Sequence, residues 1–595
     1  MNLRRKAETA RNSFKTSGWR GIEWRLRHNI VFGSQKRNYQ KWIRLYDTLT
    51  DKDRNEIRVC IEDFNYKPLI SVLMPVYNVD EKWLRLAIES VRKQIYTNWE
   101  FCIADDKSPK PHIRRVLEEY AALDSRFKIV FREQNGHISA ASNSALDLAT
   151  GEFCALLDHD DELSEHALYF VANEINHFPE TDVIYSDEDL IDQKGRRHEP
   201  KFKPDWSPDF FYSLNLVTHL SVYRTEILRK IDGFRTGVEG SQDYDLALRV
   251  IEQIPETHIR HIPHILYHWR AIPGSVALGI NQKDYAPEAA RRAISQHFQR
   301  VGVAAQVEET FGRLHRVVYS LPSPGPLATL ILVADENAAT SSETIKNLLT
   351  ATDYPYFEIL LVGENQSFAD SRVKTLTENF PNAAQAQNSA AQKANGEVLV
   401  FIDEKLKPKN SDWLREMVSH ALRQQIGAVG AKLLYPNDTI EHAGYILGIK
   451  GTVGNANHHL PNEFSGYFIR AKVINNFLAV SGACLATRRE LFDQIGGFDA
   501  KNLPNKFYDV DFCLRLGKKG FRTVWSPYAE LVWKKSASKE KILNFVEEEK
   551  YFKMYWSEVI TRDPFYNPNL SLANEDFSLL LPRPEGLLPY KTKNI

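Results

Sequence analysis

Four carboxylates stand within five positions in the stretch GEFCALLDHDDEL, directly after a short apolar run. They are Asp158, Asp160, Asp161 and Glu162. Two like charges about 4 Å apart repel each other by roughly 4 kcal/mol at an effective dielectric constant near 20. Such a cluster is therefore either spread into water at the start of the next helix or held together by a cation. This stretch alone leaves both interpretations open.

The surrounding elements indicate how these carboxylates are positioned. From residue 68 onward, β-rich runs alternate with helical patterns, which predicts βαβ units and an α/β fold with mainly parallel, Rossmann-like sheets. In such sheets a ligand binds beyond the carboxyl ends of the strands. The residues expected at that edge include Asn78, Asp105, Asp106, Asp158 and Asp160. Their convergence favours a binding site over a solvated turn.

The second part of the chain repeats the first. PLISVLMPVYN at 68–78 aligns with PLATLILVADEN at 326–337, and ASNSALDLATGEFCALLDHDD at 141–161 aligns with AQNSAAQKANGEVLVFIDEKL at 386–406. The stretch LPSPGP at 321–326 is typical of a linker. We therefore expect four segments: a basic, helical N-terminal extension at 1–65, two tandem α/β domains at 66–310 and 325–540, and a C-terminal helix and tail at 541–595.

Composition excludes several classes of protein. The 595 residues carry a net charge of -1, so the whole molecule has no general attraction for nucleic acid or acidic membranes. The five cysteines form no CxxC pair, which indicates a reducing compartment and argues against a zinc site or a disulfide framework. The apolar runs are far shorter than the about 20 residues of a membrane span, and no secretory signal is expected. We expect a cytoplasmic protein that binds no nucleic acid.

Residues 1–27 are an exception to this even charge. Aromatic and aliphatic side chains alternate there with eight basic residues, which are Arg4, Arg5, Lys6, Arg11, Lys15, Arg20, Arg25 and Arg27. The segment is either a helix on the anionic inner face of the cytoplasmic membrane, giving peripheral contact, or a solvated arm that folds against the next domain. Farther along, helical spacing predicts a packed helix through Tyr39, Trp42, Ile43, Tyr46 and Leu49.

An ordered series of motifs covers almost all of residues 68–270. The motifs are ISVLMPVYN, ADDKS, QNGHISAASNSALDLATGEFCALLDHDDEL and GSQDYDLALR. The series resembles family 2 glycosyltransferases, which have the GT-A fold. The second copy is similar to this family in SGACLATRRELFDQIGGFD and KFYDVDFCLRLGKKGFRTVWSPYAELVW. The tandem arrangement resembles bacterial enzymes that build O-antigen, capsule or other surface polysaccharide, rhamnosyltransferases among them.

The resemblance gives the carboxylate cluster a role. Asp158 and Asp160 match the family's DxD motif. A leaving nucleoside diphosphate must have its charge neutralised, and Mg²⁺ or Mn²⁺ bound through few carboxylates does so. The resemblance implies Asp160 as the direct ligand, with Asp158 reaching the ribose, the sugar or the metal through water. His268 matches a position near the metal or the diphosphate, with a core or surface histidine as the equally weighted alternative.

Further family positions concern the donor nucleotide. The resemblance implies that Pro75, Tyr77 and Asn78 shape the turn under the nucleoside, and that Asn135 and Gly136 form a turn beside the donor. One of Asp105 and Asp106 would accept a hydrogen bond from the imide N–H of the base, which favours uracil or thymine over guanine. The alternative for this pair is a plain Asx turn.

Asp243 matches the family's catalytic base. An acceptor hydroxyl needs a nearby carboxylate to take its proton during attack on the anomeric carbon. The nucleotide would leave from the opposite face, so the configuration inverts. The alternative is that Asp243 and Asp245 only open a helix, whose first turn favours negative charge; this alternative has more weight for Asp245.

The second domain departs from the family pattern. Asp403 aligns with Asp158 and Asp509 with Asp243, but Lys405 replaces Asp160. The other positions that differ are Gly363-Glu364, Glu336-Asn337 and Trp533, opposite Asp105-Asp106, Tyr77-Asn78 and His268. An ammonium group supplies one charge but no metal ligand. We therefore expect a degenerate domain that serves acceptor binding, chain positioning or partner contact, with a metal-independent second transferase as the alternative.

Two further points stay open from the sequence. The Asn457-His458-His459 cluster is either a metal site or, more in keeping with its lack of a third ligand, part of a loop or acceptor groove. The expected activity is transfer from a dTDP- or UDP-sugar to a growing, lipid-linked glycan acceptor, in company with other polysaccharide-assembly proteins. The rival classes are a non-catalytic assembly scaffold and a nucleotidyltransferase; the latter would need a glycine-rich phosphate loop, which PVYNVDEKW lacks.

Overall fold

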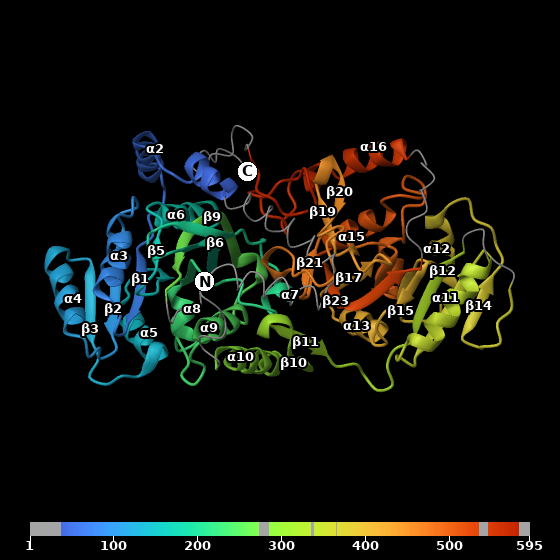
Figure 1. Ribbon diagram of the computed structural model, residues 1–595, viewed down its shortest axis with the longest axis horizontal. Helices are drawn as coiled ribbons and strands as arrows, with labels where there is room; N and C mark the ends of the chain where they lie inside the picture. The colour runs from blue at the N-terminus through green and yellow to red at the C-terminus, as the bar shows by residue number, and fades with distance from the viewer. Residues whose placement is uncertain (1–36, 273–284, 335–337, 364–365, 535–544, 582–595) are drawn as a thin grey trace, which may run out of the picture.

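The computed structural model shows two α/β domains side by side (Figure 1). It describes residues 37–272, 285–334, 338–363, 366–534 and 545–581. In Figure 1 the first domain is blue to green and the second is yellow to red. The expected fold class is confirmed. The basic stretch 1–27 lies outside the described residues.

The first domain is built on a nine-stranded sheet. Its strand order is β3-β2-β1-β4-β8-β6-β9-β5, with β7 paired to β6. Strands β1, β2, β3 and β4 run parallel, whereas β8 and β5 are antiparallel to their neighbours, so the sheet is parallel-rich but mixed. The bounds are β1 (Ile70–Val76), β2 (Trp99–Asp105), β3 (Phe127–Phe131), β4 (Phe153–Leu156), β5 (Glu162–Leu163), β6 (Val183–Ile191), β7 (Arg197–Lys201), β8 (Ser221–Arg224) and β9 (Ile259–Arg270).

The second domain repeats this topology strand by strand. Its main path is β14-β13-β12-β15-β22-β17-β23-β16, with the same parallel and antiparallel pairs in the same places. The bounds are β12 (Ala328–Val333), β13 (Phe357–Val362), β14 (Val373–Leu376), β15 (Val398–Ile402), β16 (Leu406–Pro408), β17 (Ile426–Leu434), β22 (Cys484–Arg488) and β23 (Arg522–Trp533). The internal repeat expected from the sequence is therefore a repeat of the fold. The hairpin of β10 (Ala305–Glu309) and β11 (His315–Tyr319) lies between the two sheets in sequence, and the exact domain boundaries stay predictions.

Helices cover both sheets. In α3 (Glu81–Arg92), the apolar residues Leu84, Ile88 and Val91 are buried at the spacing expected from the sequence. Their side chains recur on one face of the helix, so the face packs on the sheet. The other main helices are α4 (Pro111–Leu123), α5 (His137–Leu148), α6 (Ala167–His177), α9 (Gln242–Ile251), α10 (Ala286–Arg300), α11 (Ala338–Ala351), α12 (Ala383–Lys393), α13 (Trp413–Ala421), α14 (Arg489–Ile495), α15 (Tyr508–Lys518) and α16 (Val546–Tyr555).

One pair of hydrogen bonds between a side-chain amide and the backbone explains why the NSA and GF motifs recur in both domains. The Asn143 amide exchanges two hydrogen bonds of 2.7 Å with the backbone of Phe234. In the second domain the Asn388 amide makes the same pair with Phe498, at 2.9 Å each. A buried backbone needs such partners. The repeated NSA and GF motifs are therefore structural, and they are present in both domains although Lys405 stands opposite Asp160.

A helix over residues 37–46 buries Tyr39 and Trp42, and Trp42 packs edge-on against Phe202 of the first domain at 5.2 Å between ring centroids.

The two domains contact each other directly. Asp209 of the first domain is buried, accepts a hydrogen bond of 2.8 Å from Asn476 of the second and is paired with Arg423. Buried contacts of this kind hold domains in one arrangement. Within the described ranges, no helix has the length and apolarity to cross a bilayer.

Candidate functional site

A cavity of about 780 Å³ opens at the carboxyl ends of β1 and β4. We call it the first-domain cavity. Its lining includes most of the site residues expected from the sequence: Pro75, Tyr77, Asn78, Asp106, Asn135, Asp158, Asp160 and Asp243. Parallel strands bring their carboxyl ends to one edge, which is why residues far apart in the chain meet here.

Strand β9 holds the acidic loop behind β4. Tyr267 Oη donates a hydrogen bond of 2.6 Å to Asp161 Oδ2, and the Arg270 backbone N–H donates one of 2.7 Å to Asp161 Oδ1. The Arg270 guanidinium donates to the Asp160 carbonyl oxygen at 2.6 Å and pairs with Glu162. A cation of the protein itself thus pairs with one of the four carboxylates, that of Glu162. Asp161 and Glu162 are held by β9, while Asp158 and Asp160 line the cavity.

The charged form of Asp161 is disfavoured by its surroundings. Burial, followed by the neighbouring carboxylates of Asp160 and Asp158, raises its pKa well above the ordinary value. Ligand atoms of Asp158, Asp161 and His219 lie within 4.8 Å of one another, close enough to hold one metal ion. A dication there would relieve the repulsion, because it favours the charged form of every carboxylate around it. The residues present therefore fit a divalent metal, although this group contains Asp161 and not Asp160, the direct ligand that the resemblance implies.

His219 was not anticipated from the sequence. Its Nδ1 lies 3.3 Å from Glu188 Oε2, and its ring stacks on Tyr267 at 4.4 Å and 12°. Metal-bound histidines are commonly oriented by a carboxylate on the other ring nitrogen. The sequence signal is slight, because Thr218 and His219 are two polar residues in a mostly apolar run ahead of β8, and the role of His219 depends on the fold.

His268 is placed differently from the site expected by resemblance. Its Nδ1 is 2.7 Å from Asp189 Oδ1, and it is buried in β9 outside the lining of the first-domain cavity. Asp189 also accepts a hydrogen bond of 2.5 Å from Tyr39. This contact corresponds to the core-histidine alternative, and a role at the metal stays a prediction.

The far end of the cavity is suited to a planar base. Tyr77 is 48% exposed there, so one ring face is open to stacking. Asn78 adopts a left-handed backbone with φ 54°, and its buried Oδ1 has no hydrogen-bond partner among the described residues. An unpaired buried carbonyl oxygen is costly unless a ligand satisfies it. Pro75 lies beneath this turn in β1.

The adjoining aspartates have different surroundings. Asp106 lines the cavity and accepts hydrogen bonds of 2.9 Å from the Arg132 side chain and the Gly136 backbone. Asn135 donates to the Asp106 carbonyl oxygen at 3.1 Å. Asp105 is outside the lining, and its carboxylate accepts from the Ser108 backbone N–H at 3.3 Å, in the manner of an Asx turn. Of the two, Asp106 is therefore the one that can meet a ligand.

Asp243 lies in the first turn of α9 and faces the same cavity. Its Oδ2 accepts hydrogen bonds from Asn215 Nδ2 at 3.0 Å and Thr218 Oγ1 at 3.1 Å. Burial raises the pKa of Asp243, with a further contribution from Asp158, while His219 and Thr218 lower it. A raised pKa makes a carboxylate a better proton acceptor near neutral pH.

Asp245, two residues along, has a structural role. It is fully buried and paired with Arg235 at 2.5 Å and Arg249 at 2.8 Å. In the second domain Asp511 and Arg515 form the same pair at 2.7 Å. The helix-opening alternative thus describes Asp245, whereas the position of Asp243 on the cavity suits chemistry.

The second domain has a matching but altered cavity of about 530 Å³, lined by Asp403, Lys405 and Asp509 among others. Both oxygens of Asp509 accept backbone N–H groups: Oδ2 from Gly482 at 2.7 Å and Oδ1 from Val510 at 2.9 Å. This carboxylate therefore fixes the start of α15 and the loop before β22. The substituted positions Glu364 and Glu336-Asn337 lie outside the described residues.

The second-domain histidines are engaged by protein partners. His458 contacts Glu575 through Nδ1 and Tyr435 through Nε2, each at 3.1 Å. His442 is buried, its Nδ1 lies 2.7 Å from Asn455 Oδ1, and burial lowers its pKa to about 4. His459 faces a separate cavity between the domains.

Known proteins resemble this chain in sequence and in structure. The family models "Glycosyl transferase family 2" and "Glycosyltransferase like family 2" match residues 71–232 and 301–555. The O-antigen biosynthesis protein RfbC of Myxococcus xanthus is 36% identical over 530 residues, which cover 86% of this chain and 41% of that protein. The putative colanic acid biosynthesis glycosyl transferase WcaA of Escherichia coli K12 is 30% identical over 211 residues, 33% of this chain and 74% of that protein.

A solved structure, Staphylococcus aureus TarS in complex with UDP-GlcNAc, is 20% identical with a TM-score of 0.31 and covers 39% of this chain and 72% of that one. So distant a likeness says nothing about the ligand of this chain. Two curated relatives that match most of the chain are longer than it. The chain spans 41% of the length of RfbC and 59% of the length of the other relative. The two family matches fall on the two repeated sheets. The chain belongs to the family 2 glycosyltransferases and carries two domains of that family in tandem.

Proposed function

We propose that the first domain transfers a sugar from a nucleoside diphosphate donor to a hydroxyl of a surface polysaccharide, with inversion of configuration. The observation that carries this proposal is that Asp243 shares one cavity with Asp158 and Asp160. A proton acceptor and a set of metal-binding carboxylates are the two parts that this transfer requires. The names of two relatives, for O-antigen and colanic acid biosynthesis, support the polysaccharide class.

Asp243 acts as the general base. Asn215 and Thr218 hold its Oδ2, so the carboxylate has one orientation before the acceptor arrives. It takes the proton of the acceptor hydroxyl as that oxygen attacks the anomeric carbon. The nucleoside diphosphate leaves from the face opposite the attack, which makes a single displacement and inverts the centre.

Asp158, Asp161 and His219, whose ligand atoms lie within 4.8 Å of one another, would hold Mg²⁺ or Mn²⁺ for the leaving diphosphate, with Asp160 as a further ligand from the same cavity. The ion supplies the positive charge that the departing group needs. Tyr267 stacks on the His219 ring, and Arg270 holds the acidic loop behind β4. A direct bond from Asp160, as the resemblance implies, is part of this proposal.

The base of the donor stacks on Tyr77, above Pro75 and Asn78. Asp106 accepts from the imide N–H of uracil or thymine, with Asn135 and Gly136 holding the turn beside it. A dTDP-sugar such as dTDP-rhamnose and a UDP-sugar both meet this requirement.

The second domain is non-catalytic in this proposal. Lys405 replaces a metal-binding carboxylate, and both Asp509 oxygens are engaged by the backbone. A bifunctional enzyme is the second candidate, because the cavity of about 530 Å³ persists beside Asp509. A metal-independent transfer there would have to release Asp509 from these contacts.

The proposal also includes the setting of the reaction. The acceptor is a lipid-linked glycan, handled together with other polysaccharide-assembly proteins at the inner face of the cytoplasmic membrane. The basic segment 1–27 would supply peripheral contact with anionic lipid.

The test is donor turnover by the purified full chain. dTDP-rhamnose and a panel of UDP-sugars are each supplied with Mn²⁺, and release of the nucleoside diphosphate is measured. Release from at least one donor, abolished in Asp243→Asn, supports the transferase. Absence of both release and nucleotide binding for every donor would contradict it and favour a non-catalytic scaffold.

A further inference from the structure

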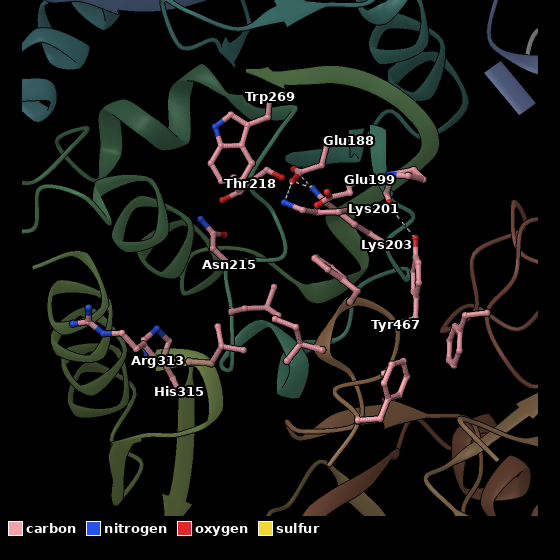
Figure 2. A pocket seen from close by; sticks show the side chains of 18 of the residues that line it. Glu188, Glu199, Lys201, Lys203, Asn215, Thr218, Trp269, Arg313, His315 and Tyr467 are labelled. Atoms are coloured by element: carbon pink, nitrogen blue, oxygen red, sulfur yellow. Dashed lines mark hydrogen bonds and ion pairs between the residues drawn. The ribbon is translucent and has the colours of Figure 1, made fainter. Parts of the chain in front are cut away.

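A second cavity, of about 990 Å³, lies between the two domains (Figure 2). We call it the interdomain cavity. One wall comes from the first domain, and the other from the second-domain loop over residues 459–469 and from the segment 576–579 near the end of the described chain. Its volume is at the upper end of the about 300–1,000 Å³ usual for ligand pockets, so it has room for more than one sugar residue.

The interdomain cavity adjoins the proposed base. Thr218 and Trp269 line both this cavity and the first-domain cavity. Asn215 and Thr218, which donate to Asp243 Oδ2, both face the interdomain side. Figure 2 shows Trp269, Thr218 and Asn215 along one side, with Tyr467 across from them. Asp243 therefore lies where a molecule in the interdomain cavity would meet a donor in the first-domain cavity.

The lining mixes aromatic rings with charged and amide groups. The aromatic members include Trp269, Phe464, Tyr467, Phe468 and Phe577, and the polar ones include Glu199, Asn215, Arg313, His315 and His459. A sugar ring has apolar C–H faces and a polar rim of hydroxyls, so it suits aromatic faces beside hydrogen-bonding groups. Asn215 Oδ1 and His315 Nδ1 are buried without a hydrogen-bond partner among the described residues, and an isoprenoid tail would leave both unsatisfied, at a cost. The composition therefore favours a glycan.

The second-domain wall is firmly attached. Tyr467 Oη donates to the Pro200 carbonyl oxygen at 3.1 Å and accepts from the Phe202 N–H at 2.8 Å. Phe468 packs edge-on against Phe210, at 5.6 Å between centroids. Phe468 and its neighbour Ile469 both have left-handed backbones, with φ 51° and 64°. Such strain in bulky residues persists where surrounding contacts enforce it, and it gathers at binding sites.

We propose that the interdomain cavity binds the acceptor glycan, and that the second domain completes the acceptor site of the first. This inference rests on the proposed function, because it assigns Asp243 as the base. It explains why the second domain keeps the fold although Lys405 stands at the position equivalent to Asp160. The loop over residues 459–469 is needed for acceptor binding even if the second-domain cavity does no chemistry.

The experiment uses the full-length protein with Mn²⁺ and UDP or dTDP present. Two probes are titrated separately: oligosaccharides released by mild acid from the surface polysaccharide of the organism that encodes the chain, and undecaprenyl phosphate in detergent micelles. The variants are Phe464→Ala and Phe468→Ala, both half-buried loop residues on the cavity. The control is Tyr356→Ala, which removes a 40% exposed ring of the same domain away from the described cavities.

We expect the oligosaccharides to bind the unaltered protein and Tyr356→Ala equally. Loss of one aromatic contact should weaken this binding about five- to tenfold in each loop variant, with nucleotide affinity unchanged. Equal glycan affinity in all four proteins, binding of undecaprenyl phosphate alone, or no glycan binding while nucleotide still binds would each overturn the inference. Glycan binding that depends on the loop without any nucleotide binding would support this site and contradict the proposed transferase.

Discussion

Thr218 Oγ1 donates a hydrogen bond to Asp243 Oδ2 over 3.1 Å, and Thr218 is exposed to both cavities. The bond stabilises the ionised carboxylate and so lowers the pKa of Asp243, against the larger effect of burial, which raises it. Thr218→Val keeps the shape and removes the donor. The pKa of Asp243 should then rise, and since the base must be ionised, the acidic limb of the kcat/KM profile should move to higher pH. A limb that stays in place would show that another group controls it.

The paired variants Asp243→Asn and Asp509→Asn separate the two domains. Loss of the general base should lower kcat by about 10²–10⁴-fold in Asp243→Asn, with donor binding retained. Asp509→Asn alters the equivalent position, where both oxygens serve the backbone. We expect its activity to stay within about twofold of the unaltered enzyme, because Asp509 is held by the backbone of its own domain. Comparable losses of kcat in both variants would favour two working sites.

Asp245→Asn should act on stability. Asp245 is fully buried between Arg235 and Arg249, and loss of one partner of a buried pair costs about 3–5 kcal/mol. Thermal unfolding should show a clear decrease. Asp243→Asn is the control: its folded pKa is raised, so ionised Asp243 destabilises the folded state at neutral pH, and its neutral replacement should not lower the unfolding temperature. A greater loss of stability in Asp243→Asn would reverse the assignment of roles.

His219 and His268 offer a direct comparison at the metal. Ligand atoms of His219, Asp158 and Asp161 lie within 4.8 Å of one another, whereas His268 is bonded to Asp189 outside the cavity. Mn²⁺ affinity, measured by electron paramagnetic resonance without substrate, should weaken in His219→Asn by at least the about 10–100-fold that loss of a residue orienting a metal ligand costs. His268→Asn should change it less. A larger loss of Mn²⁺ affinity in His268→Asn than in His219→Asn would support the role near the metal that the resemblance implies for His268.

Much of the fold could be predicted from the sequence, because it follows from local patterns. The spacing of Leu84, Ile88 and Val91 predicts α3, and the alternation of strands and helices predicts the parallel core around β1. The antiparallel strands β5 and β8 were not anticipated, since short strands give little pattern and their direction depends on tertiary pairing.

The candidate site was predictable where it follows strand ends, as for Asn78 and Asp158. The place of His219 and the hydrogen bond from Arg270 to Asp161 could not be predicted. Both require β9 and the residues before β8 to lie beside the loop that follows β4. The same limit applies to the interdomain cavity. Its residues come from distant segments that no local motif connects.

Nucleotide stoichiometry tests the central claim, a single working donor site in the first domain. UDP and dTDP are titrated by calorimetry, with and without Mn²⁺, into the full chain and into the matched variants Asp160→Ala and Lys405→Ala. We predict one manganese-dependent site per chain, lost in Asp160→Ala and kept in Lys405→Ala. Two sites per chain, or a site lost only in Lys405→Ala, would contradict the account.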